Sequence, residues 1–517
     1  MKFDEILSQY LGDFGAYQKR IYFLVCLPPI WCAMNMFSWT FTLVQVPHRC
    51  QLPSQGFSVP NDTTLEKCYV LENDTDLLPC PVGYEWDTSE FSSSALLDWT
   101  LVCDRAWLKA VAQSLFYVGI SIGSLLLGYL ANVVGRKKVI LFGSLLITVA
   151  SILCVWSPSV QVFTAFRIFH GLVEPALWQI PFAMGVELVG PSKRTLAGMW
   201  IECFFSGGLV LLGSVAYFIR DWKTLQIVIS APGFLFAFYY WILPESPRWL
   251  LAVGRKEEAY EVLRKAARVN GVSLPEETLL LLDEDEEKGT EQRSYSYLDL
   301  VRTPTLRRKT IICCFCWTTV VFVYYGISLN PSAIGGEFYS SFILSGLVEV
   351  PSLIFLILTL NILGRKFLQM TGFLVSGLAL VITVFVPAEY ELLVLVLVLI
   401  SRLSVTSAFC VIYLHTSEIF PTVLRSIAMG LTVTCSRFGG IVSPIASMYL
   451  AHSTTYRHLT LLIFGGLAMV AAFLTMFLPE TAYKKLPESL EDGEEFGKEI
   501  SLCAGEGYIL PQKENVI

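Results

Sequence analysis

Charged residues and histidine are scarce in this chain, and the common catalytic motifs are missing. Only 16% of the 517 residues are charged and five are histidine, whereas soluble domains average about 25% charged. There is no HExxH metal motif and no GxxxxGK[ST] phosphate loop. Neither a nucleophile–base set nor a metal-ligand spacing is found, so we expect no enzyme activity, no ATP-driven pumping, no metal and no cofactor.

Long apolar runs, in contrast, are abundant. Hydrophobic residues make up 54% of the chain and the mean hydropathy is +0.57. A run of roughly 20 apolar residues crosses a bilayer core. The first run lacks a small-residue cleavage site, which indicates a retained helix and not a signal peptide. We predict twelve spans, of which the fourth and the eleventh contain polar residues: 21–45, 107–131, 138–156, 161–183, 199–219, 224–242, 310–329, 339–362, 367–387, 391–414, 426–450 and 458–478.

Three motifs occur twice, each pair separated by roughly 230 residues. GRKK at Gly135 returns as GRK at Gly364, and LPES at Leu243 returns as LPET at Leu478. An acid precedes an arginine by the same spacing in both halves, as Glu187 to Arg194 and as Glu418 to Arg425. The repetition predicts two related six-helix bundles, an arrangement that usually carries solutes between its halves.

Basic residues predict the orientation. The short connections that fall on one side carry Arg136, Lys137, Lys138, Lys193, Arg194, Arg365, Lys366 and Arg425. We expect this side, with both termini, to be cytoplasmic. The 46–106 segment lies on the other side and has three basic residues against ten acidic ones. The net charge of −7 comes largely from acidic stretches exposed to solvent, and it gives no reason to expect a nucleic-acid partner.

Four of the fourteen cysteines lie in the 46–106 segment: Cys50, Cys68, Cys80 and Cys103. An even set in an extracytoplasmic loop predicts two disulfides, with three possible pairings. The same segment contains two glycosylation acceptors, Asn61 and Asn73. Nine of the other cysteines lie in or beside predicted helices, where we expect them to be small buried hydrophobes.

We therefore predict an all-α, multi-pass membrane protein in which twelve transmembrane helices form two pseudo-symmetric bundles within the lipid bilayer. The predicted segments are a cytoplasmic N-terminus (1–20), helix 1 (21–45), an extracellular loop (46–106), helices 2–6 (107–242), a cytoplasmic linker with short helices (243–309), the second bundle (310–478) and an acidic cytoplasmic tail (479–517).

A series of motifs follows the chain over nearly its whole length: WTLVCDR at 99–105, GYLANVVGRKK at 128–138, RIFHG at 167–171, LPESPRWLL at 243–251, YYGISLN at 324–330, GLVEVP at 346–351 and SEIFPTVLRSIAMG at 417–430. Together with the cysteine-rich loop, this combination resembles the organic ion transporter branch of the major facilitator superfamily, which includes organic cation, organic anion and carnitine carriers. The resemblance implies the major facilitator fold and a polyspecific carrier in the plasma membrane. Residues 328–351 are most similar to the carnitine and organic-cation carriers.

One departure from that family concerns the gate. The family's first cytoplasmic loop usually has an acid where this chain has Asn132, and the mirrored loop has Asn361 where an acid is common. Asparagine can form a hydrogen bond but no ion pair, so we expect a weaker latch. We assign gating to residues at the predicted cytoplasmic helix ends, with plain topology determinants as the alternative: Asn132, Arg136, Arg167, Glu187, Arg194, Asn361, Arg365, Glu418 and Arg425.

Ionisable residues inside membrane helices are costly and are therefore functional candidates. In the family, the position of Arg437 resembles one that holds arginine in anion and carnitine carriers and an acid in typical cation carriers. Arg437 could bind a substrate carboxylate, or it could be a packing charge satisfied by another helix. Glu202 could face an ammonium group, or lie at the cytoplasmic rim near Arg194. Glu349 could contact substrate, although the family has an acid here across substrate classes, which favours a structural or coupling role.

Aromatic and amide side chains complete the predicted site. Aromatic faces bind quaternary ammonium groups, and the seventh predicted helix and its end carry Trp317, Tyr324, Tyr325 and Asn330. Packing is the alternative for each of the aromatics. Gln113 and Gln179 are candidate polar lining groups. His170 and His415 could titrate in a proton-coupled cycle, but single helix histidines are more often packed and hydrogen-bonded.

We therefore expect a transporter of small organic ions that works by alternating access and favours a carnitine-like zwitterion or an organic cation. An organic anion transporter is the alternative, and a receptor-like membrane protein of the same fold is the alternative from a different class. Sodium or proton coupling is open.

Overall fold

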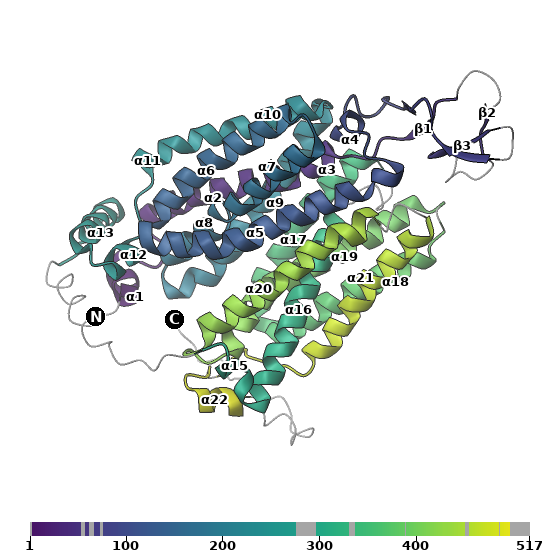
Figure 1. Ribbon diagram of the computed structural model, residues 1–517. Coiled ribbons are helices and arrows are strands. Elements are labelled where there is room, and N and C mark those ends of the chain that lie inside the picture. Colours follow the sequence, from purple (N-terminus) through teal and green to yellow (C-terminus); the bar gives the residue numbers. More distant parts are fainter. Residues whose placement is uncertain are drawn as a thin grey trace.

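The computed structural model describes residues 3–52, 57–60, 67–72, 76–275, 296–329, 337–387, 389–449, 454–484 and 486–496. Its long helices form two bundles that lie side by side (Figure 1). The strands lie at one end of the molecule, and α1 (Phe3–Ile6) and α22 (Leu490–Glu495) at the other. We call these the strand end and the terminal end.

Each bundle contains six passes along its length. The first has α2 (Ala16–Phe37) with α3 (Trp39–Thr42), α5 (Trp107–Val134), α6 (Arg136–Leu153), α7 (Val160–Val173) with α8 (Gln179–Glu187), α9 (Arg194–Phe218), and α10 (Trp222–Ser230) with α11 (Tyr239–Ile242). The second has α16 (Pro304–Ser328), α17 (Phe338–Leu363), α18 (Arg365–Phe385), α19 (Glu391–Ile419), α20 (Arg425–Pro444) and α21 (Thr454–Thr475). The predicted twelve-helix fold is confirmed.

Ten helical segments among the described residues are long and apolar enough to cross a membrane. The passes at 160–187 and 425–444 are not among the ten, and they correspond to the two predicted runs that contain polar residues, 161–183 and 426–450. The first of them is interrupted by a 3-10 turn, η4 (Glu174–Ala176), with Pro175 in its first turn. Proline has no N–H for the helical ladder, so it ends α7 at this point.

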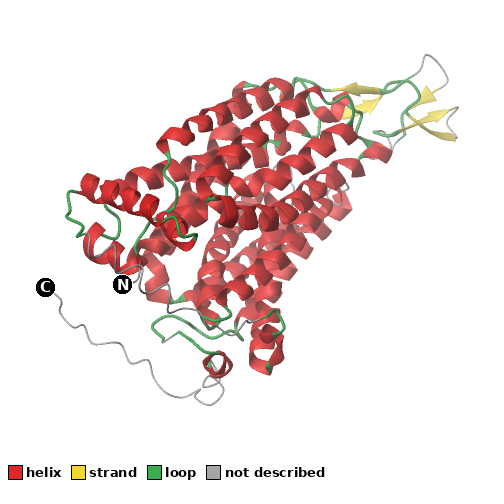
Figure 2. Cartoon of the chain, turned by 60° about the vertical axis from the view of Figure 1, so that its left-hand side comes forward, coloured by secondary structure: helices red, strands yellow, loops and turns green. Residues whose placement is uncertain are grey.

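Smaller elements decorate both ends. Short helices at the terminal end are α12 (Pro247–Ala252), α13 (Lys256–Asn270) and α15 (Asp299–Arg302). The strand end has α4 (Ala95–Asp98) and five strands, β1 (His48–Cys50), β2 (Phe57–Ser58), β3 (Tyr69–Glu72), β4 (Asp76–Pro79) and β5 (Tyr84–Trp86), which form a β1–β5 pair and a β2–β3–β4 sheet, both antiparallel. Figure 2 shows these strands confined to the one end of an otherwise helical molecule, so the all-α prediction needs this one correction.

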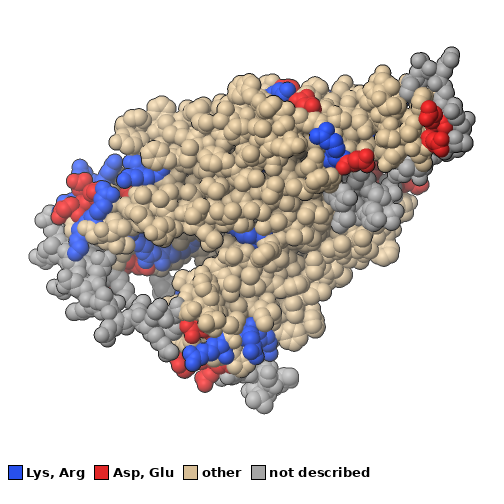
Figure 3. Space-filling model, viewed as in Figure 1, with Lys and Arg blue, Asp and Glu red and all other residues tan. Residues whose placement is uncertain are grey.

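The flanks of the bundles are apolar and exposed. Phe218, Ile362 and Phe385 are 82%, 77% and 77% exposed, which would be unfavourable in water over so large an area. Charged side chains gather near the two ends, and the flanks between them carry almost none (Figure 3). This distribution fits a molecule that crosses a bilayer with its two ends in water.

The two bundles contact each other along two seams. One seam is formed by α9 against α17 and the other by α5 against α20. Few polar bonds cross them: Ser206 Oγ donates to Glu349 Oε2 at 2.5 Å, and Ser114 Oγ donates to the carbonyl of Ile441 at 2.7 Å. A cavity lies between these seams.

Candidate functional site

A cavity with a water-accessible volume of about 70 Å³ lies between the two bundles. It is bounded by α2, α5, η4, α8 and α9 of the first bundle and by α16, α17, α19 and α20 of the second. The predicted site residues in its wall are Gln179, Glu202, Tyr324, Tyr325, Glu349 and Arg437. The structure thus brings together six of the nine residues that the sequence proposes.

Two opposite charges in this wall come from different bundles. Glu202 is on α9 and Arg437 is on α20. With a rise of 1.5 Å per residue, they lie about 12 Å and about 18 Å from the terminal-end starts of their helices. No described residue forms a hydrogen bond or ion pair with either charged group, and the Arg437 Nε is fully buried without a partner. Glu202 therefore lies in the cavity, and the alternative in which it meets Arg194 at the rim is wrong.

Glu349, by contrast, has a full set of partners. Its carboxylate pairs with Arg402 of α19 and accepts hydrogen bonds from the Tyr324 hydroxyl at 3.0 Å and from Ser206. Arg402 is 1% exposed, donates to the Tyr324 carbonyl at 2.9 Å and lies over the Tyr324 ring, 3.8 Å from its centroid. A buried charge needs such partners. The arrangement favours the structural role for Glu349.

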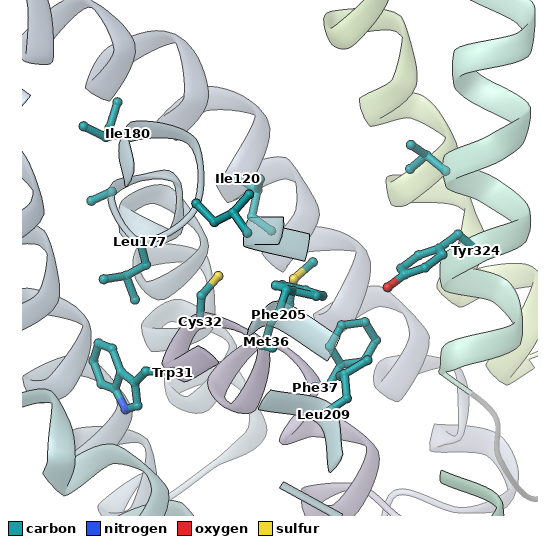
Figure 4. Close-up of a cluster of buried hydrophobic side chains, with 14 of the residues drawn as sticks. Trp31, Cys32, Met36, Phe37, Ile120, Leu177, Ile180, Phe205, Leu209 and Tyr324 are labelled. Atoms are coloured by element: carbon teal, nitrogen blue, oxygen red, sulfur yellow. The ribbon is translucent and has the colours of Figure 1, made fainter. Parts of the chain in front are cut away.

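Aromatic rings close the cavity towards the strand end. Tyr325 packs against Phe37 and Tyr117 of the first bundle, with centroid distances of 6.2 and 4.9 Å. Figure 4 shows Tyr324 of α16 across from α2, with its hydroxyl directed towards Met36, Phe37 and Phe205. Aromatic faces on both walls suit a cation held between them.

The remaining predicted site residues lie elsewhere. Trp317 is buried beside the cavity wall: its Nε1 donates to Thr416 at 2.9 Å and its ring meets Tyr413 edge-on at 4.4 Å. Gln113 is buried and accepts a hydrogen bond from Arg167 at 3.3 Å. Neither residue lines the cavity, so both are packing groups. Asn330, Asn61 and Asn73 lie outside the described residues.

The repeated motifs build the same polar cluster in each bundle at the terminal end. In the first, Arg136 bonds Glu187 at 3.1 Å, and Glu245 accepts from the backbone N–H groups of Arg136 and Lys137. In the second, Arg365 bonds Glu418 at 3.2 Å, while Glu480 accepts from the N–H groups of Arg365 and Lys366. The two acids Glu245 and Glu480 come from the repeated LPES and LPET motifs.

Glycine is required at the turn beside each cluster. Gly135 and Gly364 have φ values of 107° and 83°, a region that other residues adopt at a cost. A Cβ at Gly135 would lie 2.3 Å from a Glu245 oxygen, and one at Gly364 would lie 2.6 Å from a Glu480 oxygen. Burial raises the pKa of Glu245; at Glu480 burial acts in the same direction, but backbone hydrogen bonds outweigh it and lower the pKa.

Several predicted gating residues have other partners. Asn132 and Asn361 are exposed at the terminal end, where their backbone carbonyls accept hydrogen bonds from Trp249 and Tyr483. Arg194 pairs with Asp4 of α1 at 2.5 Å, and not with Glu187. Arg425 donates to Thr422 at 3.4 Å.

The prediction for Arg167 is wrong in its location. Arg167 lies in the middle of α7, 3% exposed, with its guanidinium 4.2 Å from the Phe116 centroid. It is therefore not at a helix end.

An aromatic cluster joins the two bundles at the strand end. Phe41 of α3 packs against Phe338, Tyr339 and Phe342 of α17, with centroid distances of 5.4, 5.9 and 4.9 Å. Phe91 adds contacts to Phe338 and Tyr339. In Figure 3 the molecule is hollowed between the bundles near the terminal end. The structure is therefore closed at the strand end and open at the terminal end.

Two disulfides hold the strand-end segment. Cys50 is joined to Cys80, and Cys68 to Cys103. This is one of the three pairings that the sequence leaves open. Among the described residues the remaining cysteines are free and buried or half-buried.

Sequence reasoning missed two buried polar groups. Arg402 is the partner of Glu349, and it is a lone charge in a long apolar run, which is the same signal that singled out Arg437. Glu174 lines the cavity, lies 2.8 Å from His170 Nε2, and accepts a bond from the Cys32 thiol at 3.0 Å. His170 is thus a packed, paired residue. His415 likewise contacts Gln369 and the Pro479 carbonyl.

Comparison with known proteins agrees with this geometry. Residues 74–492 match the family model described as "Sugar (and other) transporter". An "Organic cation transporter protein" from Drosophila melanogaster is 37% identical, over 96% of this chain and 95% of that one. The "Organic cation/carnitine transporter 2" of Homo sapiens is 31% identical, over 95% and 93%. The inward-open structure of the xylose transporter XylE from E. coli aligns with a TM-score of 0.66 at 19% identity, over 93% and 99% of the two chains.

Proposed function

Because this chain belongs to the sugar (and other) transporter family, and within it to the organic ion transporter branch of the major facilitator superfamily, we propose that its substrate is a carnitine-like zwitterion or an organic cation held in the central cavity. The protein is a carrier of small organic ions that works by alternating access. We place it in the plasma membrane with the terminal end in the cytoplasm, a placement supported by the basic residues of the short connections and by the disulfides at the strand end.

The observation that carries the substrate proposal is the pair of unpartnered opposite charges, Arg437 and Glu202. A fixed charge in a cavity is stabilised when a ligand of opposite charge replaces the water it loses. The planar guanidinium of Arg437 matches a carboxylate, and Glu202 matches an ammonium group. A zwitterion satisfies both at once, whereas a cation satisfies Glu202 alone.

The experiment is an uptake assay in cells with carnitine, a simple quaternary amine and a dicarboxylate, in the presence and absence of sodium and at several pH values. Arg437→Ala should reduce uptake of the carboxylate-bearing substrates about tenfold to a hundredfold, since a hydrogen bond to a charged group contributes about 1.5–3 kcal/mol. Glu202→Gln should reduce uptake of the two ammonium-bearing substrates. Arg307→Ala, on the exposed surface of α16, is the matched control.

An equal loss for all three substrates in Arg437→Ala would make Arg437 a structural residue and would leave Glu202 and an organic cation as the better interpretation. The relatives named organic cation transporters favour that second candidate. A protein that reaches the cell surface yet moves none of the three in reconstituted vesicles would support the receptor-like alternative.

A further inference from the structure

A second space opens from the central cavity along one seam. A groove with a water-accessible volume of about 400 Å³ follows α5 and α20, and it shares Gln179 and Arg437 with the central cavity. Its walls are mainly apolar, and they include Ile122 and Leu125 of α5 and Val433 and Phe438 of α20. The groove thus leads from the charged centre of the molecule to its apolar flank.

The other seam offers no equivalent room at its glycines. A Cβ at Gly346 of α17 would meet Leu209 and Val210 of α9 at 3.1 and 3.2 Å, and one at Gly213 of α9 would meet Ile343 of α17 at 2.7 Å. Open space beside the cavity is therefore observed at the α5–α20 seam. It begins at the guanidinium that we assign to a substrate carboxylate.

We propose that the α5–α20 groove holds the aliphatic tail of amphiphilic organic ions whose charged head lies in the central cavity. The inference rests on the proposed function, because it is Arg437 at the junction of the two spaces that anchors the head. The tail then runs along α20 from Arg437 towards Gly430, a distance of about 10 Å at 1.5 Å per residue. An octanoyl chain fits that length, and its carbons would leave water for the apolar walls.

The carrier should therefore prefer longer tails. Each methylene that the groove buries contributes up to about fourfold in apparent affinity, from about 0.8 kcal/mol per group. The test measures competition against labelled carnitine by acetyl, butanoyl and octanoyl esters of carnitine. We expect the octanoyl ester to compete at least about tenfold more tightly than the acetyl ester.

A variant that fills the groove gives the sharper result. Val433→Trp places an indole between α5 and α20, and it should remove the preference for the octanoyl ester while uptake of carnitine itself persists. Val442→Trp is the matched control, since Val442 is on the same helix, is 47% exposed and does not line the groove. This control should keep the chain-length preference.

The same series is run with alkyl trimethylammonium ions and alkyl carboxylates, so that chain length is read on whichever head group the protein carries. If no head group shows a gain with chain length in the wild type, the groove proposal is wrong even when carnitine is transported. An equal loss of short and long substrates in Val433→Trp would also overturn it, because the groove would then be part of the moving seam. Failure of the proposed function shows differently, as an absence of uptake for all short substrates.

Discussion

Removal of Arg402 tests whether Glu349 is a structural acid or a substrate contact. Arg402 is 1% exposed and is held by the Glu349 carboxylate, the Tyr324 carbonyl and the Tyr324 ring. Arg402→Met keeps much of the side-chain volume but leaves the Glu349 carboxylate without its counter-charge. Loss of one partner of a buried ion pair costs about 3–5 kcal/mol of stability.

The double variant Glu349→Gln/Arg402→Met separates the unpaired charge from the lost contacts. A glutamine at this position can still bond both the Ser206 and the Tyr324 hydroxyl, since its amide oxygen accepts from one of them and its amide NH₂ donates to the oxygen of the other, while no charge remains buried. We expect the double variant to recover most of the loss, to within about 1–2 kcal/mol of wild type, because replacing both members of a buried pair is often close to neutral.

The assay is the midpoint of thermal unfolding of the purified protein, followed by size-exclusion chromatography, together with the uptake panel. The single variant should unfold at a clearly lower temperature and transport every substrate less well. The structural interpretation would be refuted if Arg402→Met unfolded like the wild type and lost only carboxylate-bearing substrates. Arg402 would then be a ligand group, and Glu349 would be free to bind an ammonium ion.

Three further predictions concern the two ends of the molecule. Phe41→Ala should weaken the closed strand end, since each edge-to-face contact contributes about 0.5–1.5 kcal/mol. An impermeant thiol reagent applied from that side should label Cys410 at least about fivefold faster in the variant than in the wild type. An unchanged labelling rate would show that the cluster is not a gate. Gly135→Ala and Gly364→Ala should each destabilise the protein by about 1–2 kcal/mol or more, because both turns have positive φ. Gly466 has open space around it, so Gly466→Ala should leave the stability unchanged. Similar unfolding midpoints for all three variants would contradict this prediction. Burial acts to raise the pKa of Glu494, but hydrogen bonds from the first residues of α16 outweigh it and lower the pKa to about 2. The stabilisation of α22 on α16 should therefore be complete above the unfolded pKa of about 4.3 and be lost as pH falls through about 2. Proteolysis that already releases α22 at pH 5 would contradict this prediction.

The duplicated framework could be predicted from the sequence because repeated motifs reflect repeated geometry. The pairing of Arg136 with Glu187 and of Arg365 with Glu418 was within reach, since each acid and arginine lie at matched places in both halves. The full clusters were not, because Glu245 and Glu480 reach them from segments far along the chain. The LPES and LPET repeat indicated only that both halves share these acids.

The site itself was harder to predict, since hydropathy gives the span of a helix and not its rotation. Arg437, Glu202 and Tyr324 face the cavity, whereas Trp317, on the same helix as Tyr324, faces Thr416 and Tyr413. The location of Arg167 was predicted wrongly for a related reason, because the RIFHG motif does not show how far along its helix Arg167 lies. Arg402 was overlooked although its charge stood out, which shows that every lone ionisable residue in an apolar run needs a partner.

The two cavity charges belong to different bundles, and this division has a kinetic consequence. The zwitterion that we propose would link Glu202 to Arg437 and so draw the bundles together, whereas in the empty cavity the two charges have no described partner. We therefore expect the return of the unloaded protein to be the slower half of the cycle. Preloading vesicles with unlabelled substrate should accelerate entry of labelled substrate from the opposite side, so that counterflow outpaces net accumulation.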